Sequence, residues 1–100
     1  MTNYRRGYVA ENKAIHLLEK EGYFPIRSSG SHTKIDVIGI GKHDIRLIQC
    51  KRVKGKYYNF DRETDELKKL EVPSNCRKEL WIFLDRMKGR KKAELFMEIA

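Results

Sequence analysis

Three residues in the middle of the chain have types and spacing that suit metal-dependent hydrolysis. Asp36 lies in one β-branched run, and Gln49 and Lys51 lie two residues apart in the next. If Gly41 to Asp44 form the loop of a hairpin, Asp36 lies directly opposite Gln49, with Cβ atoms about 5 Å apart. Lys51 then points to the same face of the sheet as Gln49.

A second carboxylate comes from the N-terminal helix. On a wheel at about 100° per residue, Glu11 falls inside the apolar arc of that helix, which comprises Tyr8, Ala10, Ala14, Ile15, Leu17 and Leu18. A carboxylate on a buried stripe is unfavourable unless it is paired. Glu11 therefore has a partner, either a metal ion or a basic side chain such as Arg5, Arg6 or Arg27.

These residues converge if the first helix packs on the sheet face that carries Asp36. Oxygen ligands from Glu11, Asp36 and Gln49 suit Mg²⁺ or Mn²⁺ rather than zinc, and the backbone carbonyl of Cys50 adds another oxygen. Such a site hydrolyses phosphodiesters, with Lys51 orienting the water or stabilising the developing charge. The alternative is an ordinary hydrogen bond across the strands, beside a solvated lysine.

The pattern along the chain predicts the elements that position these residues. Helices are expected over residues 4–21 and 62–71, the second capped by Asp61, and strands over residues 24–28, 34–40, 45–53, 80–85 and 93–99. The order αβββαββ indicates an α/β fold, with a central mixed five-stranded sheet flanked by helices. Because no linker divides residues 1–100, we expect one domain. Both faces of the central hairpin are apolar, which predicts that both are covered.

Composition narrows the class of protein. The chain has 22 Lys and Arg against 14 Asp and Glu, a net charge of +8, and 40% hydrophobic residues. This indicates a globular protein with a polyanionic partner, most commonly nucleic acid. No apolar run reaches the roughly 20 residues of a membrane span, and two cysteines make no disulfide framework. We expect a cytoplasmic protein associated with the nucleoid.

Basic residues gather in three segments that suit phosphate contacts. The first segment opens the chain, the second follows the predicted site, and the third lies in the last hairpin: Arg5 and Arg6; Lys51, Arg52, Lys54 and Lys56; and Arg86, Lys88, Arg90, Lys91 and Lys92. Tyr57 and Tyr58 are suited to stacking on exposed bases. A solvated turn beside edge strands is the alternative for the last hairpin.

The spaced motifs resemble those of the archaeal-type Holliday junction resolvases, which belong to the PD-(D/E)XK nuclease superfamily with its restriction-endonuclease-like fold. The matching segments are Tyr4-Arg5-Arg6-Gly7, Ala10-Glu11, Leu17 to Tyr23, Arg27 to Ser31, Ile35-Asp36-Val37-Ile38 and Ile48-Gln49-Cys50-Lys51. The resemblance is closest over residues 4–52 and extends loosely along nearly the whole chain.

The resemblance implies roles for the residues at matching positions. Glu11, Asp36 and Gln49 correspond to metal ligands and Lys51 to the catalytic lysine, while Arg27 and either Ser29 or Ser31 correspond to residues near the scissile phosphate. It also implies a homodimer that cuts four-way DNA junctions with Mg²⁺, or with Mn²⁺ in its place, and it implies no small-molecule cofactor and no membrane.

One position departs from the family. Gln49 stands where resolvases usually carry Glu, which removes a negative charge from the site. Two alternatives to a junction resolvase follow: a related nuclease with another DNA substrate, or a non-catalytic protein that binds structured DNA.

Overall fold

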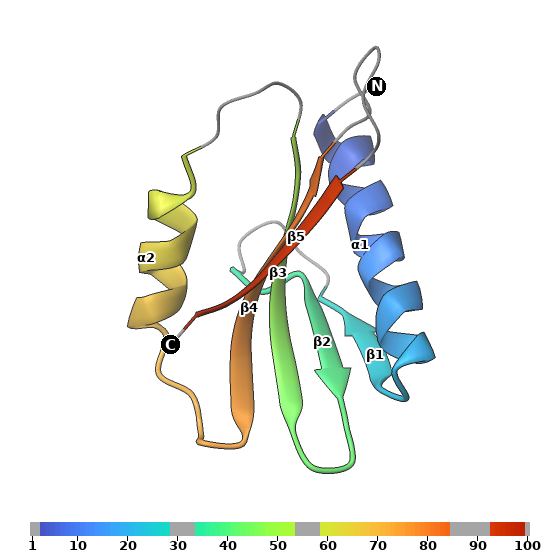
Figure 1. Ribbon diagram of the computed structural model, residues 1–100, viewed down its shortest axis with the longest axis vertical. Helices are drawn as coiled ribbons and strands as arrows, with labels where there is room; N and C mark the ends of the chain where they lie inside the picture. The colour runs from blue at the N-terminus through green and yellow to red at the C-terminus, as the bar shows by residue number, and fades with distance from the viewer. Residues whose placement is uncertain (1–2, 29–33, 54–58, 85–92, 100) are drawn as a thin grey trace.

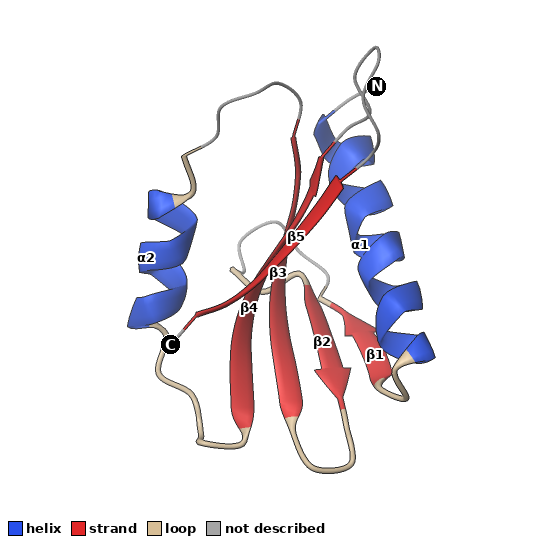
Figure 2. Cartoon of the chain, viewed as in Figure 1, coloured by secondary structure: helices blue, strands red, loops and turns tan. Residues whose placement is uncertain are grey.

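The computed structural model describes residues 3–28, 34–53, 59–84 and 93–99, without the side chains of residues 3–8 and 93–95. The predicted αβββαββ order is confirmed (Figures 1 and 2). The elements are α1 (Asn3–Lys20), β1 (Phe24–Arg27), β2 (Val37–Ile40), β3 (Ile45–Val53), α2 (Asp61–Lys69), β4 (Cys76–Leu84) and β5 (Ala93–Ile99). Neither helix is long and apolar enough, over the described residues, to cross a membrane.

The described strands form a mixed sheet, as predicted, in the order β1-β2-β3-β4-β5. Strands β3 and β4 are parallel, and the other neighbouring pairs are antiparallel. Because two parallel strands cannot be joined by a tight turn, α2 provides the crossover between them. This connection places α2 beside β4 and β5, away from α1 (Figure 1).

The helices cover opposite faces of the sheet. On one face, α1 packs on β1, β2 and β3, with a core of Ala10, Ala14, Leu18, Val37, Ile48, Cys50, Trp81 and Phe83. On the other, α2 packs on β4 and β5, with a core of Leu67, Leu80, Ile82 and Ile99. The condition set from the sequence, that α1 packs on the face of Gln49 and Lys51, is not met: α1 covers Ile48 and Cys50, and Gln49 and Lys51 alternate with them.

The choice of face has a steric reason at Gly39 of β2. A Cβ atom built on Gly39 would lie only 2.8 Å from Cδ2 of Leu18, so the helix approaches the backbone there closely. Ala10 and Ala14 are also small and fully buried. Small residues therefore meet on both sides of the contact, Gly39 on the sheet and the two alanines on the helix. This close fit favours packing of α1 on the sheet face that carries Gly39.

The hairpin register follows the prediction through most of β2. Ile40 pairs with Ile45 and Val37 pairs with Ile48, and the loop closes with a 2.8 Å hydrogen bond from the Gly41 N–H to the Asp44 carbonyl. Strand β3 has the predicted bounds. The register predicted from the apolar pattern and the loop length is therefore confirmed for β2 and β3.

The predicted pairing fails one residue further, at Asp36. Instead of facing Gln49, the Asp36 N–H donates to the carbonyl of Ile48 at 2.8 Å, although Ile48 already pairs with Val37. Two residues therefore face one, which is a β-bulge, and a bulge turns the following side chains to new directions. For the same reason Ile35 packs with the core under α2 and not, as expected, on the face of Val37.

Several element boundaries also differ from expectation, and among them β2 begins at Val37 rather than at residue 34. Asp61 is the first helical residue of α2 and not its cap. The N-cap is Phe60, which makes no side-chain cap hydrogen bond, and the Asp61 N–H is satisfied by Asn59 Oδ1 at 2.8 Å. Strand β4 begins at Cys76 rather than Leu80, because its polar first residues, 76–79, pair with β3. The local sequence pattern does not reveal this pairing.

One sheet face is less covered than the apolar pattern predicted. On the side of α2, the outer strands β1 and β2 have exposed apolar side chains: Phe24 is 66% exposed, Ile26 39% and Ile40 41%. Helix α2 contacts β4 and β5 and does not reach these strands. The expectation of a hairpin covered on both sides is therefore wrong for β2.

Candidate active site beside the second strand

Asp36 is held rigidly at the point where β2 begins. Its N–H donates to the Ile48 carbonyl at 2.8 Å, and its carbonyl accepts from the Ser28 N–H at 2.9 Å. Its carboxylate Oδ2 accepts from the Cys50 N–H at 2.8 Å. The carboxylate therefore takes the place of the missing strand partner, at the edge of β3 beyond the last paired residue of β2.

Glu11 brings a second carboxylate to Asp36 from α1. Burial raises the pKa of Glu11, and the nearby Asp36 carboxylate raises it further, while Arg27 opposes both effects. Burial also raises the pKa of Asp36, against the Cys50 hydrogen bond and the charge of Lys51. The predicted approach of Glu11 to Asp36 therefore occurs, although α1 lies on the unexpected face, because the bulge re-aims Asp36.

Arg27, one of the three arginines considered from the sequence, forms an ion pair with Glu11. Its Nε lies 3.3 Å from Glu11 Oε1, and its Nη2 donates to Asn12 Oδ1. Strand β1 presents Arg27 opposite Val37, on the face that α1 covers. An arginine at this distance partly neutralises Glu11, and its planar guanidinium is suited to phosphate recognition.

Gln49 and Lys51 lie on the other face of β3, so the structure does not gather all four predicted residues on one face. Gln49 pairs with Leu80 and Lys51 with Ile82, both of which lie in the core beside α2. The Lys51 charge nevertheless acts on Asp36. Asp36 is therefore influenced from both faces of β3, by Glu11 from the side of α1 and by Lys51 from the side of α2.

The side chain of Gln49 has an unusual environment. It is only 8% exposed, yet its Oε1 has no hydrogen-bond partner within the described parts of the chain. A buried amide oxygen without a partner is uncommon and needs an explanation. A cation ligand is one group that would satisfy it, and oxygen ligands of this kind suit Mg²⁺ or Mn²⁺.

Cys50 contributes its backbone rather than its thiol. Burial is the main cause that raises the pKa of this thiol, and the Asp36 and Glu11 charges raise it further, so it is unsuited to nucleophilic chemistry. In an extended strand the N–H and C=O of one residue point to the same edge. Because the Cys50 N–H meets Asp36, its carbonyl faces the same open edge.

Most of the remaining predicted site residues lie outside the described part of the chain. Arg52 is partly exposed and pairs with Phe83, on the face of α1. Ser29, Ser31, Lys54, Lys56, Tyr57, Tyr58 and the hairpin of residues 85–92 lie outside the described residues, as do the side chains of Arg5 and Arg6. Within the described residues, no three His, Cys, Asp or Glu side chains are grouped closely enough to hold a metal ion.

Sequence reasoning missed one acidic residue at this site. Glu63 of α2 places Oε1 at 3.7 Å from Nζ of Lys51. Its signal was available, because Glu63 precedes Leu67 by four residues and Leu70 by seven. That spacing puts Glu63 on the apolar side of the helix, as it does Glu11 on α1.

Comparison with known proteins identifies the family of the chain and a solved structure with a similar fold. A sequence model of the archaeal Holliday junction resolvase (Hjc) family matches residues 2–98. A solved structure, the 1.6 Å structure of Archaeoglobus fulgidus Hjc, described as a Holliday junction resolvase from an archaeal hyperthermophile, is similar with a TM-score of 0.69. That chain is 20% identical, and the match covers 93% of the present chain and 72% of the other.

Proposed function

The chain belongs to the archaeal Holliday junction resolvase family, and from this premise we propose that it cleaves four-way DNA junctions by Mg²⁺-dependent hydrolysis at Glu11, Asp36, Gln49 and Lys51. Family membership makes the chain a nuclease of Holliday junctions, with a place in DNA recombination and repair, and it implies use of a divalent metal. The identity of the metal, the site residues and a homodimeric assembly are the proposed parts.

The observation that carries the proposal is the fixed Asp36 carboxylate beside Glu11. Burial raises the pKa of both groups, so the fold holds two carboxyl groups where their charged forms are disfavoured. A divalent cation would reverse this penalty, because it favours the charged form of both groups. Arg27 offsets the penalty only in part, since its charge lowers the pKa of Glu11 without cancelling the effects of burial and of Asp36.

The donor set fits magnesium. Two carboxylates, the unpartnered Gln49 Oε1 and the Cys50 carbonyl are oxygen ligands, and Mg²⁺ usually keeps several waters besides a few such ligands. When bound, the ion polarises the phosphoryl oxygen and lowers the pKa of a bound water. Mn²⁺ would substitute because it accepts the same ligands.

The chain's own residues supply the remaining parts of the reaction. The Lys51 ammonium, on the opposite face of β3, would stabilise the charge that develops on the phosphoryl group. Arg27, which is paired with Glu11, is suited to bind a phosphate oxygen. The basic residues of the first two segments named from the sequence, at positions 5–6 and 51–56, would hold the DNA backbone.

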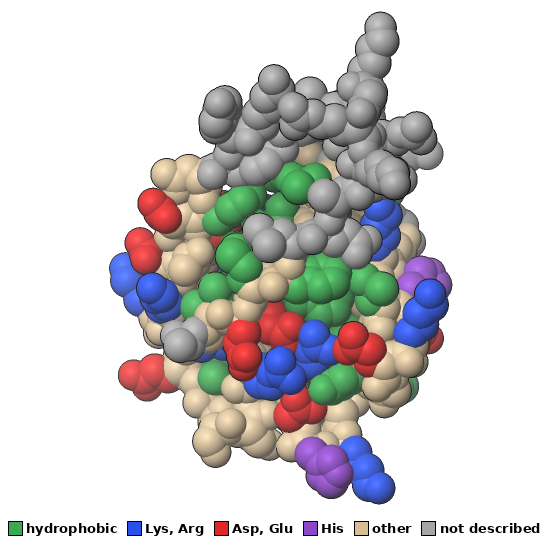
Figure 3. Space-filling model, viewed as in Figure 1, with side chains coloured by type: hydrophobic (Ala, Val, Ile, Leu, Met, Phe, Trp, Pro, Cys, Tyr) green, Lys and Arg blue, Asp and Glu red, His purple; other side chains and the backbone are tan. Residues whose placement is uncertain are grey.

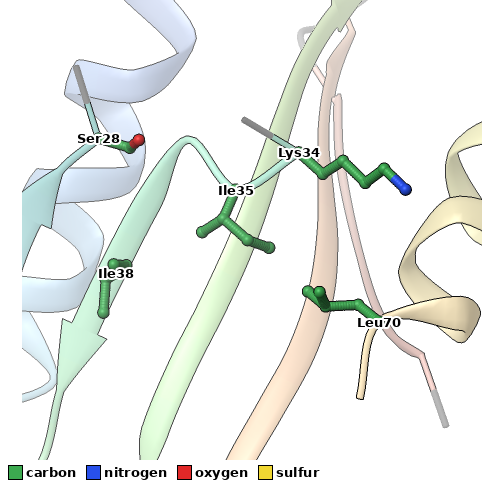
Figure 4. A pocket seen from close by; sticks show the side chains of 5 residues that line it. All are labelled: Ser28, Lys34, Ile35, Ile38 and Leu70. Carbon is green, nitrogen blue, oxygen red and sulfur yellow. The ribbon is translucent and has the colours of Figure 1, made fainter. Parts of the chain in front are cut away.

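A second copy of the chain would occupy the uncovered sheet face. Resolution of a four-way junction requires two cuts in strands related by a twofold axis, so two sites must be held in fixed relation. Phe24, Ile26 and Ile40 form an apolar surface that continues into a pocket lined by Ile35, Ile38 and Leu70, with Ser28 and Lys34 at its edge (Figure 4). An exposed apolar patch of this kind is typical of protein–protein contact.

A cleavage assay tests the function. A labelled four-way junction and a matched linear duplex are incubated with the protein in Mg²⁺ or in EDTA. We expect paired, symmetric nicks in the junction in Mg²⁺ alone. Asp36→Asn should reduce cleavage to the EDTA level while junction binding, measured by gel shift, persists. Asp65→Asn, a change at an exposed carboxylate of α2, is the control and should cut normally.

Other outcomes separate the alternatives. Equal cutting of duplex and junction would assign the chain another DNA substrate, and a retarded junction that is never cut in Mg²⁺ or Mn²⁺ would make it a binding protein. Normal cutting by Asp36→Asn would place the active site elsewhere.

A further inference from the structure

Glu63 occupies an unfavourable position for a carboxylate. It lies in the first turn of α2, and its side chain is 19% exposed. Leu67, one turn later on the same side of the helix, is completely buried. The other acidic side chains of α2 lie further out: Asp61 and Asp65 are exposed, and Glu66 is paired with Arg62. Helix stability alone would be served by an exposed acid in this turn, as Asp61 already is.

The partners of Glu63 point to the proposed site. Its Oε1 lies 3.7 Å from Lys51 Nζ, whereas its Oε2 is buried and has no hydrogen-bond partner in the described part of the chain. A buried carboxylate oxygen without a partner is a substantial penalty. It indicates that the side chain is retained for its effect on Lys51 rather than for the stability of the fold.

The neighbouring Gln49 shows what Glu63 adds. Gln49 and Lys51 are two residues apart in β3 and face α2 together. The Gln49 Oε1 is buried and unpartnered in the described structure, and the amide carries no charge. Of Gln49 and Glu63, the two polar side chains with an unpartnered buried oxygen on the side of α2, only Glu63 can carry a negative charge.

We propose that Glu63 is a positioning residue for junction cleavage, which holds the Lys51 ammonium and supplies, from α2, the negative charge that Gln49 lacks. The inference rests on the proposed function of this site. Without Glu63, the Lys51 ammonium would turn toward Asp36, whose carboxyl it already influences. There it would repel the divalent cation and leave the position from which it acts on the phosphoryl group.

The test is a double-mutant cycle between positions 49 and 63. Glu63→Gln should lower the single-turnover cleavage rate and the Mn²⁺ affinity, each by about 10-fold or more, as expected when a residue supporting a metal site is removed. Gln49→Glu, made in the Glu63→Gln background, should restore both to within about 3-fold of wild type, because the charge returns to the same face. Junction affinity should stay unchanged throughout.

Two controls distinguish positioning from folding. Asp61→Asn removes an exposed carboxylate from the same helical turn and should leave rate and Mn²⁺ affinity unchanged. Glu63→Asp, which keeps the charge, should retain more of both than Glu63→Gln. Equal effects of Asp61→Asn and Glu63→Gln, or failure of Gln49→Glu to restore either quantity, would overturn the inference.

The readouts keep the two proposals separate. Mn²⁺ affinity is measured by calorimetry on the uncut protein, so the cycle can be read even if the wild-type chain does not cleave junctions. Absence of cleavage by the wild-type chain would count against the proposed function, whereas additive effects at positions 49 and 63 on Mn²⁺ affinity would count against the role of Glu63 alone.

Discussion

At the scale of single residues, the Asp36 carboxyl group is the clearest sign of function. It is bound by the Cys50 N–H and still has a raised pKa, chiefly because burial disfavours its charged form. Glu11 has the same tendency, for the same main reason. A pair of carboxyl groups kept in this state destabilises the metal-free protein at neutral pH, which is the arrangement expected where a cation binds.

This leads to a prediction on stability and pH. Because the folded-state pKa of Asp36 is raised above its usual value of 3.8, its contribution to stability is greatest below that value and is lost as pH rises through the folded-state pKa. Asp36→Asn removes the ionisation. Relative to wild type, the variant should therefore gain stability in EDTA as pH rises from about 4 to about 8.

Urea unfolding of both proteins across this pH range measures the difference. The same comparison in Mg²⁺ should show the wild type stabilised and Asp36→Asn unaffected. If the difference in stability between wild type and Asp36→Asn did not change with pH, the fold would not disfavour the charged form of Asp36.

At the scale of elements, a buried ion pair fastens β3 to β4 under the end of α1. Arg46 donates to both carboxylate oxygens of Glu79, at 2.7 and 2.8 Å, and also to Glu21 at the end of α1. The Trp81 indole donates to the same Glu79 at 2.9 Å. In the space-filling view, acidic and basic side chains intermingle over the lower part of the sheet (Figure 3).

Electrostatics favour the charged form of this pair. Burial alone would raise the pKa of Glu79, but hydrogen bonds from Arg46 and Trp81 outweigh it and leave the pKa below its usual value. The hydrogen bond with Glu79 is likewise the main cause that raises the pKa of Arg46. The stability that Glu79 contributes is therefore present above its unfolded-state pKa and is lost as pH falls through the lowered value.

Removal of one partner should expose this dependence. Arg46→Ala leaves the Glu79 carboxylate, which is 3% exposed, without its main partner, and we expect a loss of about 3–5 kcal/mol in the free energy of unfolding. The double change Arg46→Met with Glu79→Leu should cost far less, because it removes both charges together. Equilibrium urea unfolding near neutral pH measures both, and equal losses in the two proteins would contradict the pairing.

At the scale of the whole molecule, the net charge of +8 and the apolar face of β1 and β2 suit different partners. The charge favours DNA, while the surface formed by Phe24, Ile26 and Ile40 favours a second copy of the chain. Strand register places these side chains on one face, since Phe24 pairs with Ile40 and Ile26 with Ile38. Glu11 and Arg27 lie on the opposite face of the sheet, under α1, whereas Gln49 and Lys51 share the face of this apolar surface.

A single substitution tests the assembly. Ile26→Lys introduces a charge into the apolar face, and because full burial of one such side chain is worth about 1.5–3 kcal/mol, dimer affinity should fall by at least about 10-fold. Phe96→Lys, at an apolar residue 44% exposed on the other face, is the control. Sedimentation equilibrium measures the dimer, and paired junction cuts should become single nicks in Ile26→Lys. Dissociation by Phe96→Lys alone would move the interface to the other face.

The sequence by itself determined the order of the elements, the hairpin register, and the presence of a carboxylate on the apolar stripe of α1. These are local properties, since periodicity, loop length and apolar spacing act within one or two elements. The same spacing argument also places Glu63 on the apolar side of α2, four residues before Leu67.

Only the tertiary structure decided which face each helix covers and how the site assembles. Both faces of β3 are apolar, so alternation shows that Gln49 and Cys50 point oppositely but not which of them meets α1. That choice depends on the close fit of Leu18 over Gly39, a contact between elements far apart in the chain. The bulge then turns Asp36 to the open edge of β3, where carboxylates, amide and lysine can converge from opposite faces because no strand covers that edge within the described residues.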